Sequence, residues 1–410
     1  MIQLNEKQTE AKDKLVSFIL NSEEKAIILT GAAGTGKTRT IVETMQEFKK
    51  LERMTKLIDP DAEPISWYIT ATTNKAKQAL KDSLKGIEVT TIHSLLGLAM
   101  RGKSLRKVRE NEVLKNSVIV IDECSYIDYR LLDFINDVDN VKIIYVGDEQ
   151  QLAPVRLNHS PVFKCGYEMI ELTETVRAVN APSIASYCAD MRAFIKAEGK
   201  GVKLPLLLPD VAIEHVSMDD FKALTHKVFI TQKQSTDDHR ILAYSNAVVT
   251  AHNERLFHAE NGRTDFAVGD TVLVNSYANG FKTDEQVTLQ SSVVGTWSDI
   301  AGVRYQALGD VHSGTLFSPY NYTAALKELE KRVYGKDYIH SKQDDESLRL
   351  LADLRPLYSC TIHKSQGSTF DTVYIDLSGF SKIRDVVALA RLLYVGISRA
   401  SRKVVLTGDI

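Results

Sequence analysis

Short apolar runs alternate with amphipathic stretches along the first 150 residues of the chain. The run Ala26–Leu29 precedes a helix-compatible stretch over 41–50, and further apolar runs occupy 67–71, 118–121 and 141–146. The four consecutive β-branched residues at 118–121 are typical of a strand that is buried on both faces, as in a parallel sheet. The pattern therefore predicts an α/β fold with a parallel sheet.

The hydrophobic pattern changes in the second half of the chain. Ile241–Asn253 predicts a strand followed by a helix, and period-two alternation begins at 266–274. With further strand candidates near Val293, Tyr305 and Leu308, this alternation predicts a small inserted β-barrel, followed by a charged helix over 323–336. We expect the α/β pattern to resume after Pro356.

Composition limits the kinds of site that the chain can carry. The 410 residues have a formal net charge of -2, so a site for a polyanion has to be a local groove. The four cysteines form no C-x-x-C pair, which fits a reducing compartment, and the ten histidines show no metal-ligand spacing. No apolar run approaches the roughly 18 residues of a membrane span, and no signal peptide is recognisable. We expect a soluble, cytoplasmic protein, in the host cytoplasm if a phage encodes it.

The stretch Gly31–Thr38 has the G-x-x-x-x-G-K-[ST] pattern of a phosphate-binding loop, placed between a predicted strand and a predicted helix. Glycines let successive backbone N–H groups surround an anion, Lys37 supplies a point charge and Thr38 offers a hydroxyl to Mg²⁺. A glycine-rich turn without a ligand is the alternative, which the correct flanks disfavour. The pattern predicts ATP and Mg²⁺ as ligands, held by Gly31, Gly34, Thr35, Gly36, Lys37 and Thr38.

Two carboxylates, Asp122 and Glu123, end the β-branched strand. A P-loop enzyme needs one carboxylate to hold Mg²⁺, and a second one often positions and deprotonates the attacking water. We assign Asp122 to the first role and Glu123 to the second. Because a small-molecule kinase would not need Glu123 here, the pair favours hydrolysis.

A predicted hairpin around Gly102 carries five basic residues within nine positions, namely Arg101, Lys103, Arg106, Lys107 and Arg109. Such a cluster is suited to gripping phosphates or wedging against a duplex, and it is equally compatible with a surface loop. The polar stretch Thr72–Ala76 follows a predicted strand, where ligands collect in open α/β sheets.

The pair Asp122-Glu123, followed by G-D-x-x-Q-L-x-P at Gly147–Pro154, resembles motifs II and III of superfamily 1 helicases. Further stretches resemble the remaining motifs of that family: Gln8 the adenine-reading Q motif, Gly31–Thr38 motif I, Thr70–Ala76 motif Ia, Thr91–Ser94 motif Ib, Leu172–Arg177 motif IV, Thr361–Asp371 motif V and Leu393–Ala400 motif VI, with Ser398 where threonine is commoner.

The resemblance implies roles for particular residues. Gln151 would sense the γ-phosphate, and Arg177 and Arg399 would be arginine fingers from a second lobe. Lys37 and Glu123 complete the catalytic set, while Gln8 and Gly367 join the nucleotide-binding residues. The residues implied for nucleic-acid binding are Thr72, Asn74, His93, Met100, Asn246, Thr361 and His363.

The motifs are most similar to superfamily 1B, the RecD and phage Dda type. This implies two RecA-like motor domains, 1–157 and 158–262 with 355–410, a hairpin insertion at about 95–115 and an SH3-like β-barrel at 263–354. It also implies 5′-to-3′ movement on single-stranded DNA, a strand-separating pin tipped by Met100 or a neighbour, and a role in replication or recombination. Because the motifs start near residue 4 and end ten residues before the C-terminus, we expect a compact, Dda-like enzyme.

The expected partners are single-stranded and forked DNA and single-strand-binding or other replication proteins, with no membrane, and the expected state is a monomer. Two alternatives stay open: an RNA helicase or protein-displacing translocase, and a P-loop switch that uses ATP to gate partner binding. Stimulation of ATP hydrolysis by DNA, by RNA or by neither separates these classes.

Overall fold

The computed structural model describes residues 4–61, 63–84, 86–101, 104–109, 114, 116–154, 157–174, 181–334 and 341–409. The side chains of Asp82, Met100, Arg101 and Ser104 also lie outside the described part. The chain divides into two compact units, one formed by Met1–Ser217 with Ile362–Ile410 and the other by Met218–Thr361. The domain boundaries near 157, 262 and 354 stay predictions.

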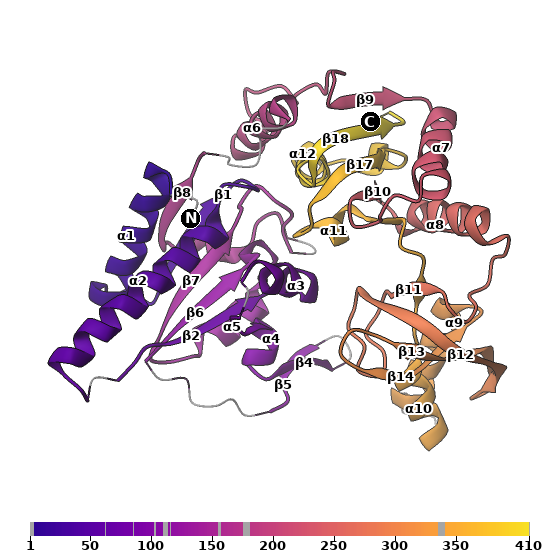
Figure 1. The fold of residues 1–410 in the computed structure, drawn as a ribbon, viewed down its shortest axis with the longest axis horizontal. Helices are drawn as coiled ribbons and strands as arrows, with labels where there is room; N and C mark the ends of the chain where they lie inside the picture. Colours follow the sequence, from indigo (N-terminus) through magenta and orange to yellow (C-terminus); the bar gives the residue numbers. More distant parts are fainter. Residues whose placement is uncertain are drawn as a thin grey trace. The chain divides into compact units, whose positions relative to one another are not determined.

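Unit 1 begins with a six-stranded sheet in which every neighbouring pair is parallel (Figure 1). The predicted α/β fold with a parallel sheet is therefore confirmed. The strands lie in the order β3-β2-β6-β7-β1-β8, with the bounds β1 (Ala26–Gly31), β2 (Ser66–Ala71), β3 (Val89–Thr91), β6 (Ser117–Asp122), β7 (Val141–Gly147) and β8 (Glu168–Leu172).

Helices cover both faces of this sheet. Alternate residues of β1 point to opposite faces, so Ile27 and Leu29 join one core while Ala26 and Ile28 join another. The first core contains α1 (Glu6–Asn21), α2 (Lys37–Ile58) and α3 (Asn74–Ser83). The second contains α4 (Ile92–Leu95), α5 (Tyr129–Asn136) and the short turns η1 (Cys124–Tyr126) and η2 (Pro161–Lys164). Burial on both faces explains the uninterrupted apolar runs of the strands.

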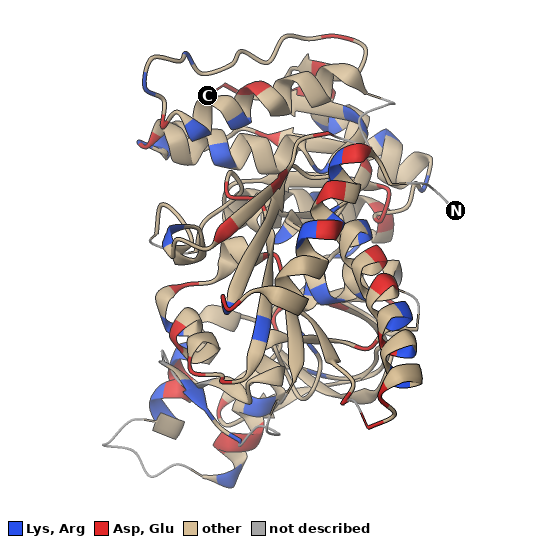
Figure 2. Cartoon of the chain, turned by 90° about the vertical axis from the view of Figure 1, so that its left-hand side faces the viewer, with Lys and Arg blue, Asp and Glu red and all other residues tan. Residues whose placement is uncertain are grey.

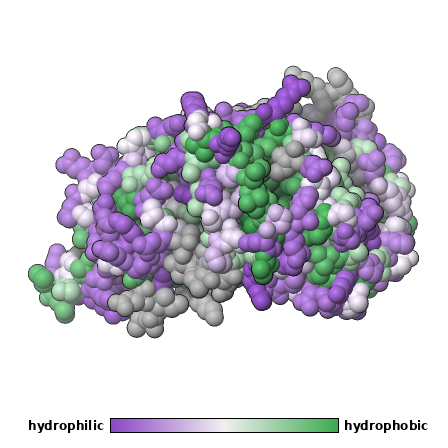
Figure 3. Space-filling view, turned by 90° about the horizontal axis from the view of Figure 1, so that it is seen from above, coloured by the Kyte–Doolittle hydropathy of each residue, from purple (hydrophilic) through white to green (hydrophobic). Residues whose placement is uncertain are grey.

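Helix α2 is longer than the predicted stretch at 41–50, and only its first half packs on the sheet. Its buried residues end at Phe48, whereas Leu57 and Ile58 are 86% and 87% exposed. Exposed apolar side chains of this kind form small green areas among hydrophilic ones on the face drawn in Figure 3. The last turns of α2 therefore gain no stability from the core.

A second parallel arrangement in unit 1 consists of β17 (Phe370–Asp376), β18 (Ala400–Thr407) and β9 (Ile213–Val216). Helices α6 (Pro182–Lys196) and α12 (Val386–Ile397) pack against each other beside it, with α11 (Ile362–Ser365) and η5 (Phe380–Lys382) nearby in the chain. Residues 389–397 of α12 are all buried, so this helix is internal rather than amphipathic.

The predicted hairpin is present as β4 (Leu98–Arg101) and β5 (Ser104–Lys107), which pair antiparallel with Met100 opposite Leu105. That this hairpin is an insertion in a first motor domain stays a prediction. The strand-separating role of this hairpin stays a prediction.

Unit 2 contains two groups of elements. The first comprises α7 (Met218–His226), the π-helical turn η4 (Lys227–Thr231), β10 (His239–Ala243), α8 (Asn246–Asn261) and β16 (Ser359–Thr361), with β10 and β16 parallel. The second is a sheet of order β14-β13-β12-β11-β15, with the bounds β11 (Thr271–Val274), β12 (Glu285–Trp297), β13 (Ile300–Leu308), β14 (Ser313–Pro319) and β15 (Leu354–Arg355). Helices α9 (Tyr322–Tyr334) and α10 (Lys342–Leu350) share a core with β14.

Local chemistry explains where these strands begin and turn. The alternation at 266–274 includes a predicted Gly-Asp turn, and the strand Thr271–Val274 follows that turn, in which the Asp270 carboxylate accepts from the Ala267 N–H at 2.8 Å. Between β12 and β13, Ser298 and Asp299 both have positive φ, 49° and 58°. A two-residue turn of this kind matches the twist of a hairpin.

Charged side chains of both signs alternate along the helices of the face shown in Figure 2, in keeping with the net charge of -2. Attraction of a polyanion therefore has to come from local groups. Among the described residues, no helix is both long enough and apolar enough to cross a membrane.

The buried Asn253 of α8 predicts a measurable contribution to folding. Its Oδ1 accepts from Ser359 N at 2.8 Å and its Nδ2 donates to Ser359 O at 3.1 Å, so one side chain satisfies both backbone groups of a β16 residue. We expect Asn253→Ala to lower the free energy of unfolding by about 3 kcal/mol, because two buried backbone groups lose their partners. Denaturant unfolding measures this loss. The exposed neighbour Glu254→Ala is the control and should change stability by less than about 0.5 kcal/mol.

Candidate nucleotide site

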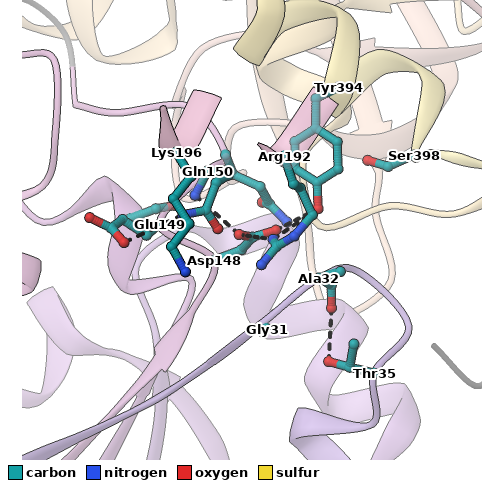
Figure 4. Close-up of polar contacts among 12 residues, drawn as sticks. Gly31, Ala32, Thr35, Asp148, Glu149, Gln150, Arg192, Lys196, Tyr394 and Ser398 are labelled. Atoms are coloured by element: carbon teal, nitrogen blue, oxygen red, sulfur yellow. Dashed lines mark hydrogen bonds and ion pairs between the residues drawn. The ribbon is translucent and has the colours of Figure 1, made fainter. Parts of the chain in front are cut away.

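The phosphate loop connects β1 to α2 and depends on backbone conformations that favour glycine. Gly34 and Gly36 have φ of 82° and 86°, in the left-handed region. A β-carbon on Gly36 would collide with Nε2 of Gln8. The Thr35 hydroxyl donates to Ala32 O at 2.9 Å and closes the loop on itself (Figure 4).

Lys37 lies half-buried at the first turn of α2, with its ammonium enclosed by the loop. Its ammonium donates to Gly31 O at 2.7 Å and Ala32 O at 2.9 Å. Burial lowers the pKa of Lys37, and the carboxylates of Asp148, Glu123 and Asp122 oppose that shift. The charge is therefore surrounded by weak acceptors that a triphosphate would replace with stronger ones.

Gln8 supports the loop from α1. It is 5% exposed, and its Nε2 donates to Thr35 O at 3.0 Å. Its Oε1 accepts from Asn5 N at 3.1 Å, which completes a capping box at the start of α1. In this structure Gln8 thus uses both ends of its amide to brace the loop, and adenine recognition by Gln8 stays a prediction.

Asp122 and Glu123 end β6, as the sequence predicts. Burial, with the neighbouring Glu123 carboxylate, raises the pKa of Asp122 to about 7, while Lys37 acts in the opposite direction. Glu123 has φ of 54°, which is uncommon for a residue with a side chain and recurs at functional sites. A half-buried pair of acids next to a single ammonium is an environment that a divalent cation would stabilise.

One cavity of about 470 Å³ in unit 1 gathers most of the predicted nucleotide site. Nine predicted residues line it, from five separate places in the chain: Gly34, Gly36, Lys37, Thr38, Asp122, Glu123, Gln151, Gly367 and Arg399. Gly31 and Thr35 belong to the same loop but do not line the cavity, and Arg177 lies outside the described residues.

Arg399 also lines this cavity and is fixed by hydrogen bonds to the backbone. It is 4% exposed, its Nε donates to Val395 O at 3.0 Å and another guanidinium nitrogen donates to Ser368 O at 3.1 Å. These contacts use backbone acceptors rather than carboxylates, so the positive charge of Arg399 is not neutralised by an ion pair.

The donor set fits a magnesium nucleotide. In the described ranges no group of three or more His, Cys, Asp or Glu side chains could hold a metal ion by itself. Mg²⁺ is ordinarily bound by one or two protein ligands together with phosphate oxygens and waters. Thr38 and Asp122 line the cavity and are the residues that would supply the protein ligands.

The residues predicted for nucleic-acid binding are distributed over both units. In unit 1, the Thr72 hydroxyl donates to Glu123 O at 3.1 Å, Asn74 begins α3, and His93 lies half-buried in α4. Burial lowers the pKa of His93, with Asp128 opposing, so a contact from this imidazole at neutral pH would be a hydrogen bond without charge.

The remaining residues predicted for nucleic-acid binding follow in chain order. In unit 2, Asn246 begins α8 and accepts from Arg355 at 3.1 Å, while Thr361 ends β16. In unit 1, His363 lies in α11, and its carbonyl accepts from the Tyr126 hydroxyl at 3.1 Å. The side chain of Met100 lies outside the described part of the chain.

The sequence analysis did not select Gln366, and it interprets Lys75 as a residue that could meet a phosphodiester backbone. Gln366 is 4% exposed, and its Nε2 donates to Glu123 Oε2 at 3.1 Å and to Ser125 Oγ at 3.2 Å. Lys75 donates to Lys364 O at 2.7 Å. Both lie inside stretches that resemble motifs V and Ia, but only the folded chain pairs them with their partners.

Two family models match the chain. Residues 16–156 match an AAA domain, and residues 356–407 match the UvrD-like helicase C-terminal domain. The first range holds the phosphate loop, the acid pair and Gln151, and the second holds Gly367 and Arg399.

Several known proteins are similar to the chain. The uncharacterized protein R530 of Acanthamoeba polyphaga mimivirus is 24% identical over 97% of this chain and 98% of that protein. The ATP-dependent DNA helicase Pif1 of Psychrobacter sp. is 24% identical over 90% of this chain and 64% of Pif1. RecBCD enzyme subunit RecD of Buchnera aphidicola subsp. Schizaphis graminum is 28% identical over 37% of this chain. The chain spans 27% of that RecD subunit.

Among solved structures, the Pif1 helicase from Bacteroides in complex with ADP-AlF3 and ssDNA has a TM-score of 0.55 at 18% identity, covering 100% of this chain and 94% of that chain. A Pif1 structure described for DNA unwinding at forked dsDNA has a TM-score of 0.55 at 17% identity, covering 100% and 93%. At this identity the likeness shows the fold alone.

The fold and the cavity define a P-loop ATPase of the helicase type, built from an AAA domain and a UvrD-like C-terminal domain. The chain is similar to the RecD and Pif1 helicases, in keeping with the resemblance seen in its motifs.

The conformation of Gly36 predicts a loss of nucleotide affinity on substitution. In Gly36→Ala the new methyl group would collide with Gln8, which braces the loop, so we expect Kd for ATP to rise about ten-fold or more, the equivalent of about 1.4 kcal/mol. Titration with a fluorescent ATP analogue measures this. Gly166→Ala is the matched control, because Gly166 has φ of 77° and no atom within 4 Å of the added β-carbon. An equal effect of both variants would contradict the role of the Gln8 contact.

Proposed function

We propose that the protein is an ATP-dependent DNA helicase that moves along single-stranded DNA and separates duplex strands. The observation that carries this proposal is the single cavity where the phosphate loop and the acid pair meet Gly367 and Arg399 of the UvrD-like domain. An ATPase in which two domains contribute to one site can convert the state of the nucleotide into a change between those domains, because the ligand has different contacts in different arrangements.

We assign the chemical roles as follows. The loop amides and Lys37 bind the triphosphate, while Thr38 and Asp122 hold Mg²⁺, which neutralises charge on the phosphate oxygens when bound. Glu123 accepts the proton of the attacking water, and Gln366 keeps the Glu123 carboxylate in place through its amide N–H. Gln151 and Arg399 stabilise charge that develops on the γ-phosphoryl group, as does the predicted finger Arg177.

Three further parts of the proposal rest on the resemblance to superfamily 1B helicases. They include 5′-to-3′ direction, a strand-separating role for the β4–β5 hairpin, and an SH3-like role for the antiparallel sheet of unit 2. The DNA contacts would come from Thr72, Asn74, His93, Met100, Asn246, Thr361 and His363. The relatives support DNA as the track, since Pif1 carries DNA helicase in its name and a solved Pif1 structure contains ssDNA.

Replacement of the loop lysine tests the assigned site. We expect Lys37→Ala to reduce ATP turnover to the detection limit and to leave binding to single-stranded DNA largely intact, because Lys37 is assigned to the triphosphate and not to DNA. Phosphate release with and without single-stranded DNA or RNA measures turnover, and fluorescence anisotropy measures DNA binding. The control is Lys49→Ala, an exposed lysine later in α2. Near-normal turnover in Lys37→Ala would refute the site.

Forked substrates test unwinding and direction together. We expect ATP-dependent strand separation of a fork with a 5′ single-stranded tail and little separation with only a 3′ tail. Unwinding of the fork with only a 3′ tail would mean that the protein moves 3′-to-5′. If only RNA stimulated ATP hydrolysis, we would conclude that the protein moves along RNA and not along DNA. Hydrolysis that neither nucleic acid stimulates would favour a P-loop switch.

A further inference from the structure

The turn after β7 carries Gln151 and is tied down by a fully buried carboxylate. Asp148 is 0% exposed, and its Oδ2 accepts from the Tyr394 hydroxyl at 2.6 Å. Its Oδ1 accepts from the Arg192 guanidinium in an ion pair, and Arg192 also donates to Glu171 at 3.4 Å (Figure 4). An anion buried to this degree is stable only while its donors stay in place.

A second arginine holds the backbone of the same turn. Arg391 is 5% exposed, and one of its guanidinium nitrogens donates both to Glu149 O and to Gln151 O, the latter at 2.7 Å. The fixed fork of a guanidinium suits two adjacent carbonyl groups. With its main chain anchored, the Gln151 side chain lines the nucleotide cavity, and its Oε1 is buried without a hydrogen-bond partner among the described residues.

The donors and the turn come from different parts of the chain. Asp148–Gln151 lies within the AAA match, whereas Arg391 and Tyr394 lie in α12, within the UvrD-like match. Arg192 lies in α6, which packs on α12, and its guanidinium lies 5.9 Å from the centre of the Tyr394 ring. Any displacement of α6 and α12 relative to β7 therefore has to break these hydrogen bonds or move the turn.

We propose that Arg192, Tyr394 and Arg391 are positioning residues that set the place of Gln151 in the nucleotide cavity and link it to the movement of α6 and α12. This inference rests on the proposed ATPase function and adds a named connection to it. The three side chains act through the turn and need not contact the nucleotide.

Tyr394→Phe is the most conservative test, because it removes one hydroxyl and keeps the ring. We expect kcat of DNA-stimulated ATP hydrolysis to fall about ten-fold or more, as for the loss of one hydrogen bond to a buried charge, with KM for ATP nearly unchanged. Tyr145→Phe is the matched control, because Tyr145 is a buried residue of β7 whose hydroxyl has no hydrogen-bond partner among the described residues. It should leave kcat unchanged.

A double-mutant cycle with Gln151→Ala separates positioning from a general loss of stability. If Tyr394 acts through Gln151, the double variant should be no slower than Gln151→Ala alone. Independent, multiplying losses would overturn the proposal, as would a normal kcat in Tyr394→Phe. Thermal unfolding of each variant is measured alongside, and a loss of kcat in Tyr394→Phe that is restored simply by lowering the temperature would also count against positioning.

The arginines provide a second line of evidence. We expect Arg391→Met to uncouple hydrolysis from unwinding, so that fewer base pairs are separated per ATP, and Arg391→Lys to restore part of that ratio by donating to one carbonyl. An unchanged ratio in Arg391→Met would overturn the proposal. A failure of the proposed ATPase function can be told apart from a failure of the positioning proposal. In the first case the unmodified protein itself would show no ATP turnover that depends on Lys37.

Discussion

The site depends on one buried ammonium among three carboxylates. Lys37 is enclosed near Asp148, Glu123 and Asp122, and burial shifts its pKa and that of Asp122 in opposite directions, each toward the neutral form. Neither charge would be stable at this depth without the other. A triphosphate with a divalent cation adds both a strong acceptor for the lysine and a positive charge for the acids. Because the acids outnumber the ammonium, a divalent cation would offset their excess negative charge, and this local charge set does not require a net positive chain.

The order of the strands brings these charges together. β1 pairs with β7, and β7 pairs with β6, all in parallel, so the loop before Lys37, the turn at Asp148 and the acid pair emerge from the same edge of the sheet. Neighbouring strands lie about 4.8 Å apart, which sets the spacing of the three groups. Because of this strand order, Asp122 and Glu123 need not supply all the ligands of a bound cation. The acid pair faces a loop that is shaped for phosphate, and phosphate oxygens would complete the coordination of the cation.

Local patterns in the sequence were sufficient for the elements that position this site. The loop glycines, the β-branched run at 118–121 and the two acids that follow it each carry a short-range signal, and the structure brings them to one cavity. The contacts that connect distant segments had no such signal. Gln366 reaches Glu123 across 243 residues, and Arg391 reaches Gln151 across 240. The local sequence pattern around a glutamine in a motif, or around an arginine in a buried helix, does not indicate which distant residue it contacts. The Gly-Asp turn within 266–274, by contrast, has a short-range signal, since its hydrogen bond joins Asp270 to Ala267, three residues away.

Two glutamines show how the domains meet at the nucleotide. Gln151 extends from the AAA domain and Gln366 from the UvrD-like domain, both are 4% exposed, and in both the Oε1 atom is buried without a partner among the described residues. An amide can donate and accept without carrying charge, so it adds little to the charge balance around Lys37. Each glutamine is anchored differently, Gln151 through its backbone by Arg391 and Gln366 through its amide N–H by Glu123. Movement between the domains would therefore displace the two amides by different amounts. The Oε1 atom of each glutamine is the acceptor that a bound water or another hydrogen-bond donor could then use.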